Sequence, residues 1–78
     1  MTFPQIERIT LDPQVMGGKP CIRGMRVTVG MITGMLASGC SEKELLALYS
    51  YLEPEDIRAA LSYATWRTEE RDIALAAA

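Results

Sequence analysis

Gly17-Gly18-Lys19-Pro20-Cys21-Ile22-Arg23-Gly24-Met25-Arg26 places three glycines, one proline and three cations in ten consecutive residues of a chain that is acidic as a whole. Glycine loses more backbone freedom on folding than any other residue, so such a segment is costly to order. It is expected where the backbone must turn sharply, or where cations must be presented to a partner. We call residues 17–26 the basic loop.

The residues around the basic loop predict a short β arm. Ile6 to Leu11 favours a strand because its β-branched Ile and Thr side chains suit one, and Asp12-Pro13 is a turn that ends it. Pro20 to Ile22 is a candidate second strand. Arg23-Gly24 supplies the turn after it, since Gly24 is free to adopt a positive φ.

Three helices are expected after the β arm. Thr28 can cap the first helix, and Gly39 is a suitable stop. Residues 41–44 have the spacing of a capping box, which begins the second helix. Pro54 suits the first position of the third helix, expected to run to about Arg71. A short turn before the third helix is typical of a helix-turn-helix domain, although a plain three-helix bundle shows the same pattern.

Apolar spacing predicts which helix faces are buried. In the second helix, the residues expected on or near the buried face are Leu45, Leu46, Leu48 and Tyr49. In the third helix, the expected buried stripe is Ile57, Ala60, Leu61 and Ala64. The opposite face of the third helix is expected to show Glu55, Arg58, Ala59, Ser62 and Thr65.

The length of 78 residues indicates a single domain, residues 1–78. We expect the β arm and basic loop in residues 6–27, a helical bundle in residues 28–71 and a frayed tail in residues 72–78. A chain this short buries only about 60% of the surface that its unfolded form exposes. A homodimer would supply further burial, and we expect one.

The chemistry-bearing residues are few. The chain has no His, and its two cysteines, Cys21 and Cys40, are far apart, so neither a metal site nor a cofactor is expected. Without a signal peptide both cysteines are expected to be free thiols in a cytoplasmic protein. No apolar run approaches the roughly 20 residues of a membrane span. No acid–base pair or activated nucleophile is recognisable, so we expect no enzyme activity.

Charge is divided unevenly along the chain. Residues 1–30 contain four cations and two acids, whereas residues 31–78 contain four cations and eight acids. The basic end is therefore the better candidate for contact with nucleic acid, because phosphate binding depends on Lys and Arg.

Five residues are candidates for DNA contact. Lys19, Arg23 and Arg26 could contact phosphates from the basic loop. From the third helix, Arg58 could reach a guanine edge and Ser62 a phosphate. The alternatives are structural: Arg23 or Arg26 pairs with acids of the helical half, and the face of the third helix is simply solvated.

Gly17, Gly18, Pro20 and Gly24 form a structural signature of turns within the basic loop. They do not make a nucleotide-binding loop, which requires a hydroxyl residue directly after its lysine to hold magnesium. Here Pro20 follows the lysine and offers neither a hydroxyl group nor an amide hydrogen.

Residues 9–13, the basic loop with Val27, residues 36–41 and residues 55–64 resemble the bacterial domain-of-unknown-function family 433, also described as VapB-like antitoxins. The most specific part is the Gly-Lys-Pro-x-Ile-Arg-Gly-x-Arg core within residues 18–26. The resemblance implies a mainly α fold, a three-helix homeodomain-like helix-turn-helix with a short N-terminal β arm. It also implies an antitoxin paired with a PIN-like ribonuclease toxin. Glu53 departs from the family, in which Thr or Ser usually caps the third helix.

Two functions are compatible with these observations. The first is a homodimeric antitoxin that binds duplex DNA to regulate its own promoter, with the basic arm on DNA and the acidic, Ala-rich C-terminal region on the toxin. The second is a protein-interaction module that uses a helix-turn-helix fold without binding DNA. Salt-sensitive DNA affinity distinguishes them, because the second function predicts no such affinity and predicts affinity for a partner protein instead.

Overall fold

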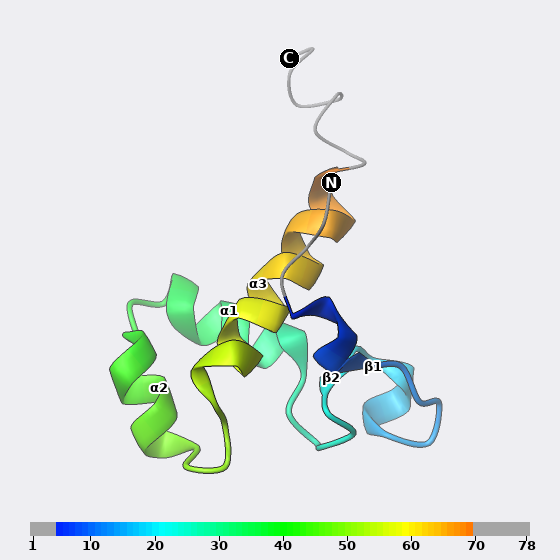
Figure 1. The fold of residues 1–78 in the computed structure, drawn as a ribbon, viewed down its shortest axis with the longest axis horizontal. Helices are drawn as coiled ribbons and strands as arrows, with labels where there is room; N and C mark the ends of the chain where they lie inside the picture. Colours follow the sequence, from blue (N-terminus) through cyan, green and yellow to red (C-terminus); the bar gives the residue numbers. More distant parts are fainter. Residues whose placement is uncertain (1–4, 70–78) are drawn as a thin grey trace.

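The computed structural model describes residues 5–69 (Figure 1). In chain order, the elements of this part are η1 (Ile6–Arg8), β1 (Ile9–Thr10), η2 (Met16–Gly18), β2 (Cys21–Ile22), α1 (Val29–Ala37), α2 (Glu42–Leu48) and α3 (Pro54–Glu69). The prediction of a mainly helical protein with three helices after a short N-terminal sheet is therefore confirmed. The predicted helix end at Arg71 and the predicted frayed tail, residues 72–78, lie outside the described residues.

The β arm is shorter than predicted. β1 and β2 are antiparallel, with Ile9 opposite Ile22 and Thr10 opposite Cys21. The residues before β1 form η1, a 3-10 turn that contacts α3, instead of extending the strand. At one end of the sheet the chain turns directly after β2, where Arg23 and Gly24 have φ values of 46° and 73°.

Local signals begin and end the helices as predicted. The Thr28 hydroxyl accepts a hydrogen bond from the Met31 amide at 3.1 Å, which caps α1. Gly39 follows α1 with a φ of 101°, a conformation that favours glycine. Before α2, the Ser41 hydroxyl accepts from the Glu44 amide at 3.0 Å and the Glu44 carboxylate accepts from the Ser41 amide at 2.9 Å. The predicted capping box is thus confirmed.

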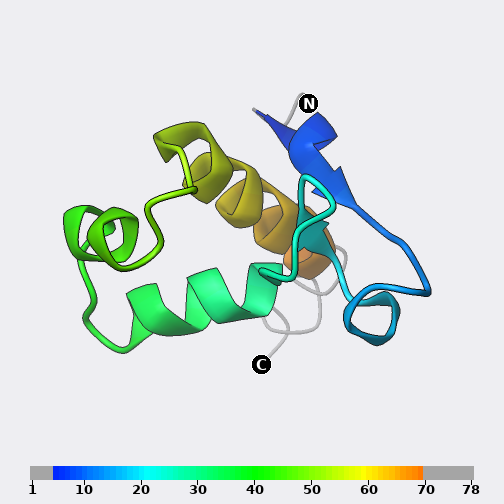
Figure 2. The same ribbon diagram turned by 90° about the horizontal axis from the view of Figure 1, so that it is seen from below.

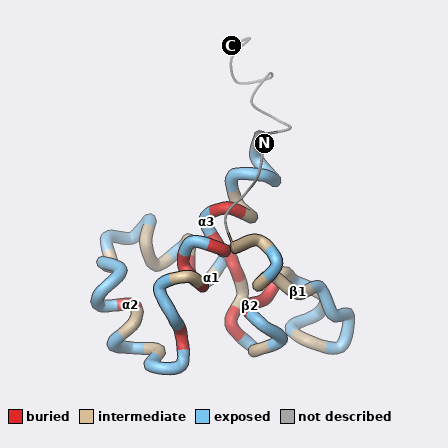
Figure 3. Tube along the Cα trace, viewed as in Figure 1, coloured by how far each residue is buried: buried red, intermediate tan, exposed pale blue. Residues whose placement is uncertain are grey.

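The core lies where α1, α3 and β2 meet, with α2 closing one end (Figures 2 and 3). Its buried members come from every part of this junction: Ile22, Val27, Val29, Ile32, Leu45, Leu52, Ile57 and Ala60. Cys21 is buried and Cys40 half-buried, and both thiols are free, as predicted. No helix among residues 5–69 is both long enough and apolar enough to cross a membrane.

The predicted helix faces were wrong at four positions. Ala59 and Ser62 are buried, at 0% and 9% exposure, although they were placed on the open face of the third helix. Leu61 and Leu48 were placed on or near buried faces but are 46% and 66% exposed. The prediction missed Ala59 and Ser62 because α3 packs against both α1 and the N-terminal segment. Its buried face is therefore wider than the predicted stripe and includes neighbouring positions. α2 is short, and Leu45 alone of its residues is fully buried.

Candidate functional site

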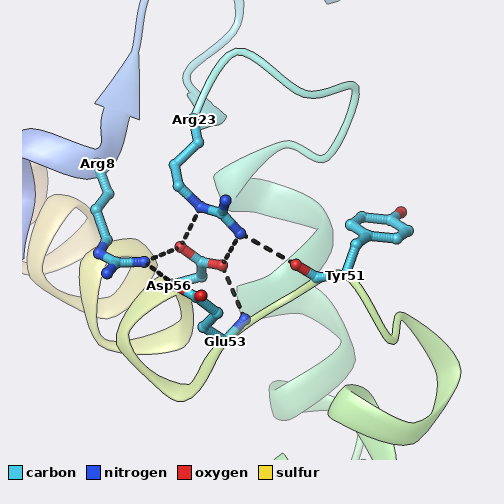
Figure 4. Close-up of polar contacts among 5 residues, drawn as sticks. All are labelled: Arg8, Arg23, Tyr51, Glu53 and Asp56. Atoms are coloured by element: carbon cyan, nitrogen blue, oxygen red, sulfur yellow. Dashed lines mark hydrogen bonds and ion pairs between the residues drawn. The ribbon is translucent and has the colours of Figure 1, made fainter.

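Asp56, in the first turn of α3, has a fully buried carboxylate that accepts four hydrogen bonds (Figure 4). Arg8 Nη1 donates to Oδ1 at 2.9 Å. Arg23 donates from Nε to Oδ1 at 3.0 Å and from Nη2 to Oδ2 at 2.8 Å. The Glu53 amide donates to Oδ2 at 2.9 Å. The two contacts from Arg23 form a bidentate pair, the strongest arrangement between a guanidinium group and a carboxylate.

Two further contacts complete this group, which we call the Asp56 cluster. Arg8 Nη1 also pairs with Glu53 Oε1 at 2.7 Å, and Arg23 Nη2 also donates to the Tyr51 carbonyl oxygen at 3.0 Å. The cluster thereby joins η1, the turn after β2, the segment before α3 and the first turn of α3. It contains two cations and two carboxylates, so its formal charges cancel.

Backbone geometry brings the two arginines together. The Arg23 amide donates to the Arg8 carbonyl oxygen at 2.8 Å. Arg23 has a φ of 46° and Gly24 a φ of 73°, so the chain turns sharply after β2. The Thr10 hydroxyl accepts from the Gly24 amide at 2.9 Å and holds this turn against β1. The turn signature at the end of the basic loop therefore serves to direct Arg23 at α3.

The Glu53 amide contact also explains how α3 begins without a Ser or Thr cap. The side chain of Asp56 reaches back to the amide of Glu53, directly before the helix, which is half of a capping box. A carboxylate near the positive end of the helix dipole is stabilised further.

The electrostatics of the cluster keep Asp56, Arg8 and Arg23 charged. Burial raises the pKa of Asp56, but hydrogen bonds from Arg23, the Glu53 amide and Arg8 outweigh it and hold the pKa below its ordinary value. Hydrogen bonds to Glu53 and then to Asp56 raise the pKa of Arg8, and the bond to Asp56 raises the pKa of Arg23. A carboxylate that stays ionised and fully hydrogen-bonded is a structural anchor and is not poised for proton transfer.

The structure separates the five candidate DNA contacts. Arg23 is paired with Asp56, as the structural alternative predicted. Ser62 is buried at 9% exposure, so its side chain offers little surface for the predicted phosphate contact. Lys19, Arg26 and Arg58 are exposed and make no ion pair within residues 5–69. Of the five candidates, these three remain as exposed cations within residues 5–69.

The signature residues of the basic loop have a structural role. Gly17, Gly18 and Gly24 all have positive φ, and the Pro20 carbonyl oxygen accepts from the Val29 amide at 2.9 Å. This last bond ties the loop to the first residue of α1. The signature residues therefore shape the backbone between the sheet and the first helix.

Sequence reasoning missed Arg8 and Asp56 as a pair. They are 48 residues apart, and both belong to residue types that usually lie at the surface. The sequence pointed to this cluster only through Arg23, because one of the two interpretations of the basic loop pairs its arginine with an acid of the helical half.

The second half of α3 carries an aromatic patch, formed by Tyr63, Trp66 and Arg67. The rings of Tyr63 and Trp66 are 5.7 Å apart, and the guanidinium carbon of Arg67 lies 5.9 Å from the centre of the Trp66 ring. Trp66 is 39% exposed. Aromatic residues and Arg are the types most enriched in binding hot spots.

Residues 9–64 match the model of a family described as a protein of unknown function, DUF433. The chain belongs to the DUF433 family. A similar solved structure is that of a DUF433 member protein from Anabaena variabilis ATCC 29413, with a TM-score of 0.75 and 36% sequence identity, covering 88% of this chain and 68% of that one.

Among curated proteins, the uncharacterised protein y4eO of Sinorhizobium fredii (strain NBRC 101917 / NGR234) is 38% identical over 58 residues, or 74% of this chain. The chain spans about a quarter of that relative, 26% of its length. The matched family region contains Arg23 and Asp56 but begins one residue after Arg8.

Proposed function

We propose that this DUF433 protein acts by binding another protein, as the antitoxin of a toxin–antitoxin pair binds its toxin, and that it is not an enzyme. One observation carries the proposal. The arginine at the centre of the family signature pairs with Asp56, so one of the three cations of the basic loop helps to build the fold and is not available to DNA. The proposed partner is a PIN-like ribonuclease toxin in the cytoplasm.

The surface of the helical half supports a protein partner. Residues 53–56, which precede and begin α3, contain three acids and no Lys or Arg, so this end of the helix offers no cation to a phosphate. The aromatic patch at the other end offers Trp66 and Arg67, the residue types that anchor protein interfaces. We include in the proposal a homeodomain-like helix-turn-helix arrangement in which α2 and α3 form the helix pair.

The test is co-purification of the tagged protein with the product of the adjacent gene, followed by calorimetry on the purified pair. We expect Trp66→Ala to weaken binding by at least tenfold, about 1.4 kcal/mol, because hot-spot aromatics dominate interfaces. The matched control is Leu61→Ala, which removes another exposed apolar side chain of α3 and should change affinity less than about threefold. Absence of a complex with that product, or equal effects of the two variants, would contradict the proposal.

DNA binding by the three exposed cations is the second candidate function, because Lys19, Arg26 and Arg58 make no ion pair within the described residues. Two phosphate contacts, by Lys19 and Arg26, predict that affinity falls roughly 12-fold between about 50 and 200 mM salt. The triple Ala variant of Lys19, Arg26 and Arg58 should abolish that dependence. Arg23 is left intact in this test, since its removal would disturb the Asp56 cluster and mix a folding effect with a binding effect.

A further inference from the structure

A shallow groove runs along the outer face of α1. Its volume is about 450 Å³, and its lining is Gly30, Met31, Gly34, Met35, Ser38 and Cys40. Figure 2 shows α1 along one edge of the body, with α3 packed on the opposite side of the helix and α2 beyond its C-terminal end. None of the elements described in residues 5–69 covers the outer side. We call these six residues the α1 groove.

No contact among the described residues of one protomer requires glycine at the two glycine positions within α1. A Cβ atom added at Gly30 or at Gly34 would meet nothing within 4 Å among the described residues, and neither glycine has a positive φ. Alanine would therefore fit at both positions and would favour the helix, since glycine is the less stable residue in a helix interior. Glycine at these positions allows a backbone from another molecule to approach the helix closely, which larger residues would prevent.

The α1 groove is also lined only by uncharged residues. No charged residue occurs between Arg26 and Glu42, although 23% of the chain is charged. A two-fold interface brings each residue near its own copy, so a charge at the axis would face a like charge. A charge-free helix face meets this requirement. The exposed faces of α2 and α3, which carry Lys43 and Arg58, do not.

We propose that the α1 groove is covered by a second copy of this chain, with the two α1 helices crossing antiparallel near Gly34. This inference goes beyond the proposed function and does not depend on it. Met31 and Met35 would fill the space beside the crossing, because unbranched Met side chains adapt to irregular gaps.

Charges at the two ends of α1 favour this occupant over an unrelated protein. Arg26 precedes α1 and Glu42 follows it, and both are exposed. In an antiparallel pair, the start of one helix lies beside the end of the other, so Arg26 of one protomer approaches Glu42 of its copy. The opposite charges attract, and the antiparallel helix dipoles align favourably.

The size of the groove sets the expected affinity. α1 has nine residues. A helix of this length extends about 14 Å, so the crossing covers less than the roughly 800 Å² per partner of a standard interface. We expect a reversible dimer with a dissociation constant in the range of about 1 to 100 µM.

The experiment is sedimentation equilibrium of the full chain over about 1 µM to 1 mM. Gly34→Arg places bulk and a like charge at the proposed crossing and should raise the dissociation constant at least 100-fold. The matched control, Ala47→Arg, adds the same charge at an exposed position of α2 and should change it less than threefold. A wild-type monomer throughout this range, or equal dissociation constants for wild type and Gly34→Arg, would overturn the proposal.

A charge exchange tests the antiparallel orientation. Arg26→Glu should weaken the dimer, and adding Glu42→Arg to it should restore at least half of the lost affinity in free energy, because the attractive pair is rebuilt with reversed sign. Failure of the second substitution to restore affinity would overturn the antiparallel crossing.

A cross-linking measurement covers the case in which Gly34→Arg does not fold. In a Cys40→Ser background, Gly34→Cys should form an intermolecular disulfide under mild oxidation, whereas Ala47→Cys should not. Cys21 remains in both variants, since it is buried. Equal cross-linking at the two positions, or none at Gly34→Cys, would overturn the proposal.

Discussion

Replacing Asp56 by Ala should reduce the stability of this protein more than any substitution of a surface acid. The carboxylate is fully buried and accepts four hydrogen bonds from Arg8, Arg23 and the Glu53 amide. In Asp56→Ala the two guanidinium groups regain water, because their side chains are 25% and 37% exposed. The bonds that join the N-terminal segment to α3 are lost.

The magnitude follows from what is removed. Breaking a buried ion pair from one side costs about 3–5 kcal/mol, and the partial exposure of the two arginines places this case at about 3 kcal/mol. A domain of 78 residues has a total stability of roughly 4–12 kcal/mol. The substitution thus removes a quarter or more of the stability, and the melting temperature should fall by roughly 12–24 °C.

Urea denaturation followed by circular dichroism measures this effect. The control is Glu53→Gln, which removes an exposed member of the same cluster and should cost at most about 1 kcal/mol. Asp56→Asn, which keeps the size of the side chain and removes its charge, should be intermediate. If Asp56→Ala were within about 1 kcal/mol of wild type, or equal to Glu53→Gln, the cluster would not be the anchor that its geometry indicates.

Four further predictions concern stability. The folded pKa of Asp56 is depressed, so its contribution is complete above its ordinary pKa of 3.8 and is lost as the pH falls through the lower folded value; in an acid titration the difference in stability between wild type and Asp56→Asn should be constant above about pH 4 and shrink below it. Ser41→Ala should cost about 1 kcal/mol in thermal unfolding by removing the capping box of α2. Gly39→Ala should cost about 1 kcal/mol because φ is 101°, whereas Gly34→Ala, measured in dilute protein, should stabilise by about 0.5–1 kcal/mol. Leu48→Ser should change the free energy of unfolding in urea by less than about 0.5 kcal/mol, since Leu48 is 66% exposed, and a large loss would place it in the core.

The helix boundaries could be predicted because each depends on neighbours in the chain. Thr28, Ser41 and Gly39 act through amides or carbonyls within a few residues, so the pattern alone identifies them. The faces of α2 and α3 could be predicted only in part. Burial depends on how many elements pack on a helix, and α3 contacts both α1 and the N-terminal segment, which buries Ala59 and Ser62.

By itself, the sequence determined the order of the elements, the helix caps and the turn at the end of the basic loop. The tertiary structure alone decided the role of Arg23, because its carboxylate partner is 33 residues away in the chain, and only the packing of α3 against the β arm brings them to 2.8 Å. Capping and turns are local equilibria set by adjacent residues. An ion pair between distant segments forms only after those segments have already been placed together by burial of the apolar core.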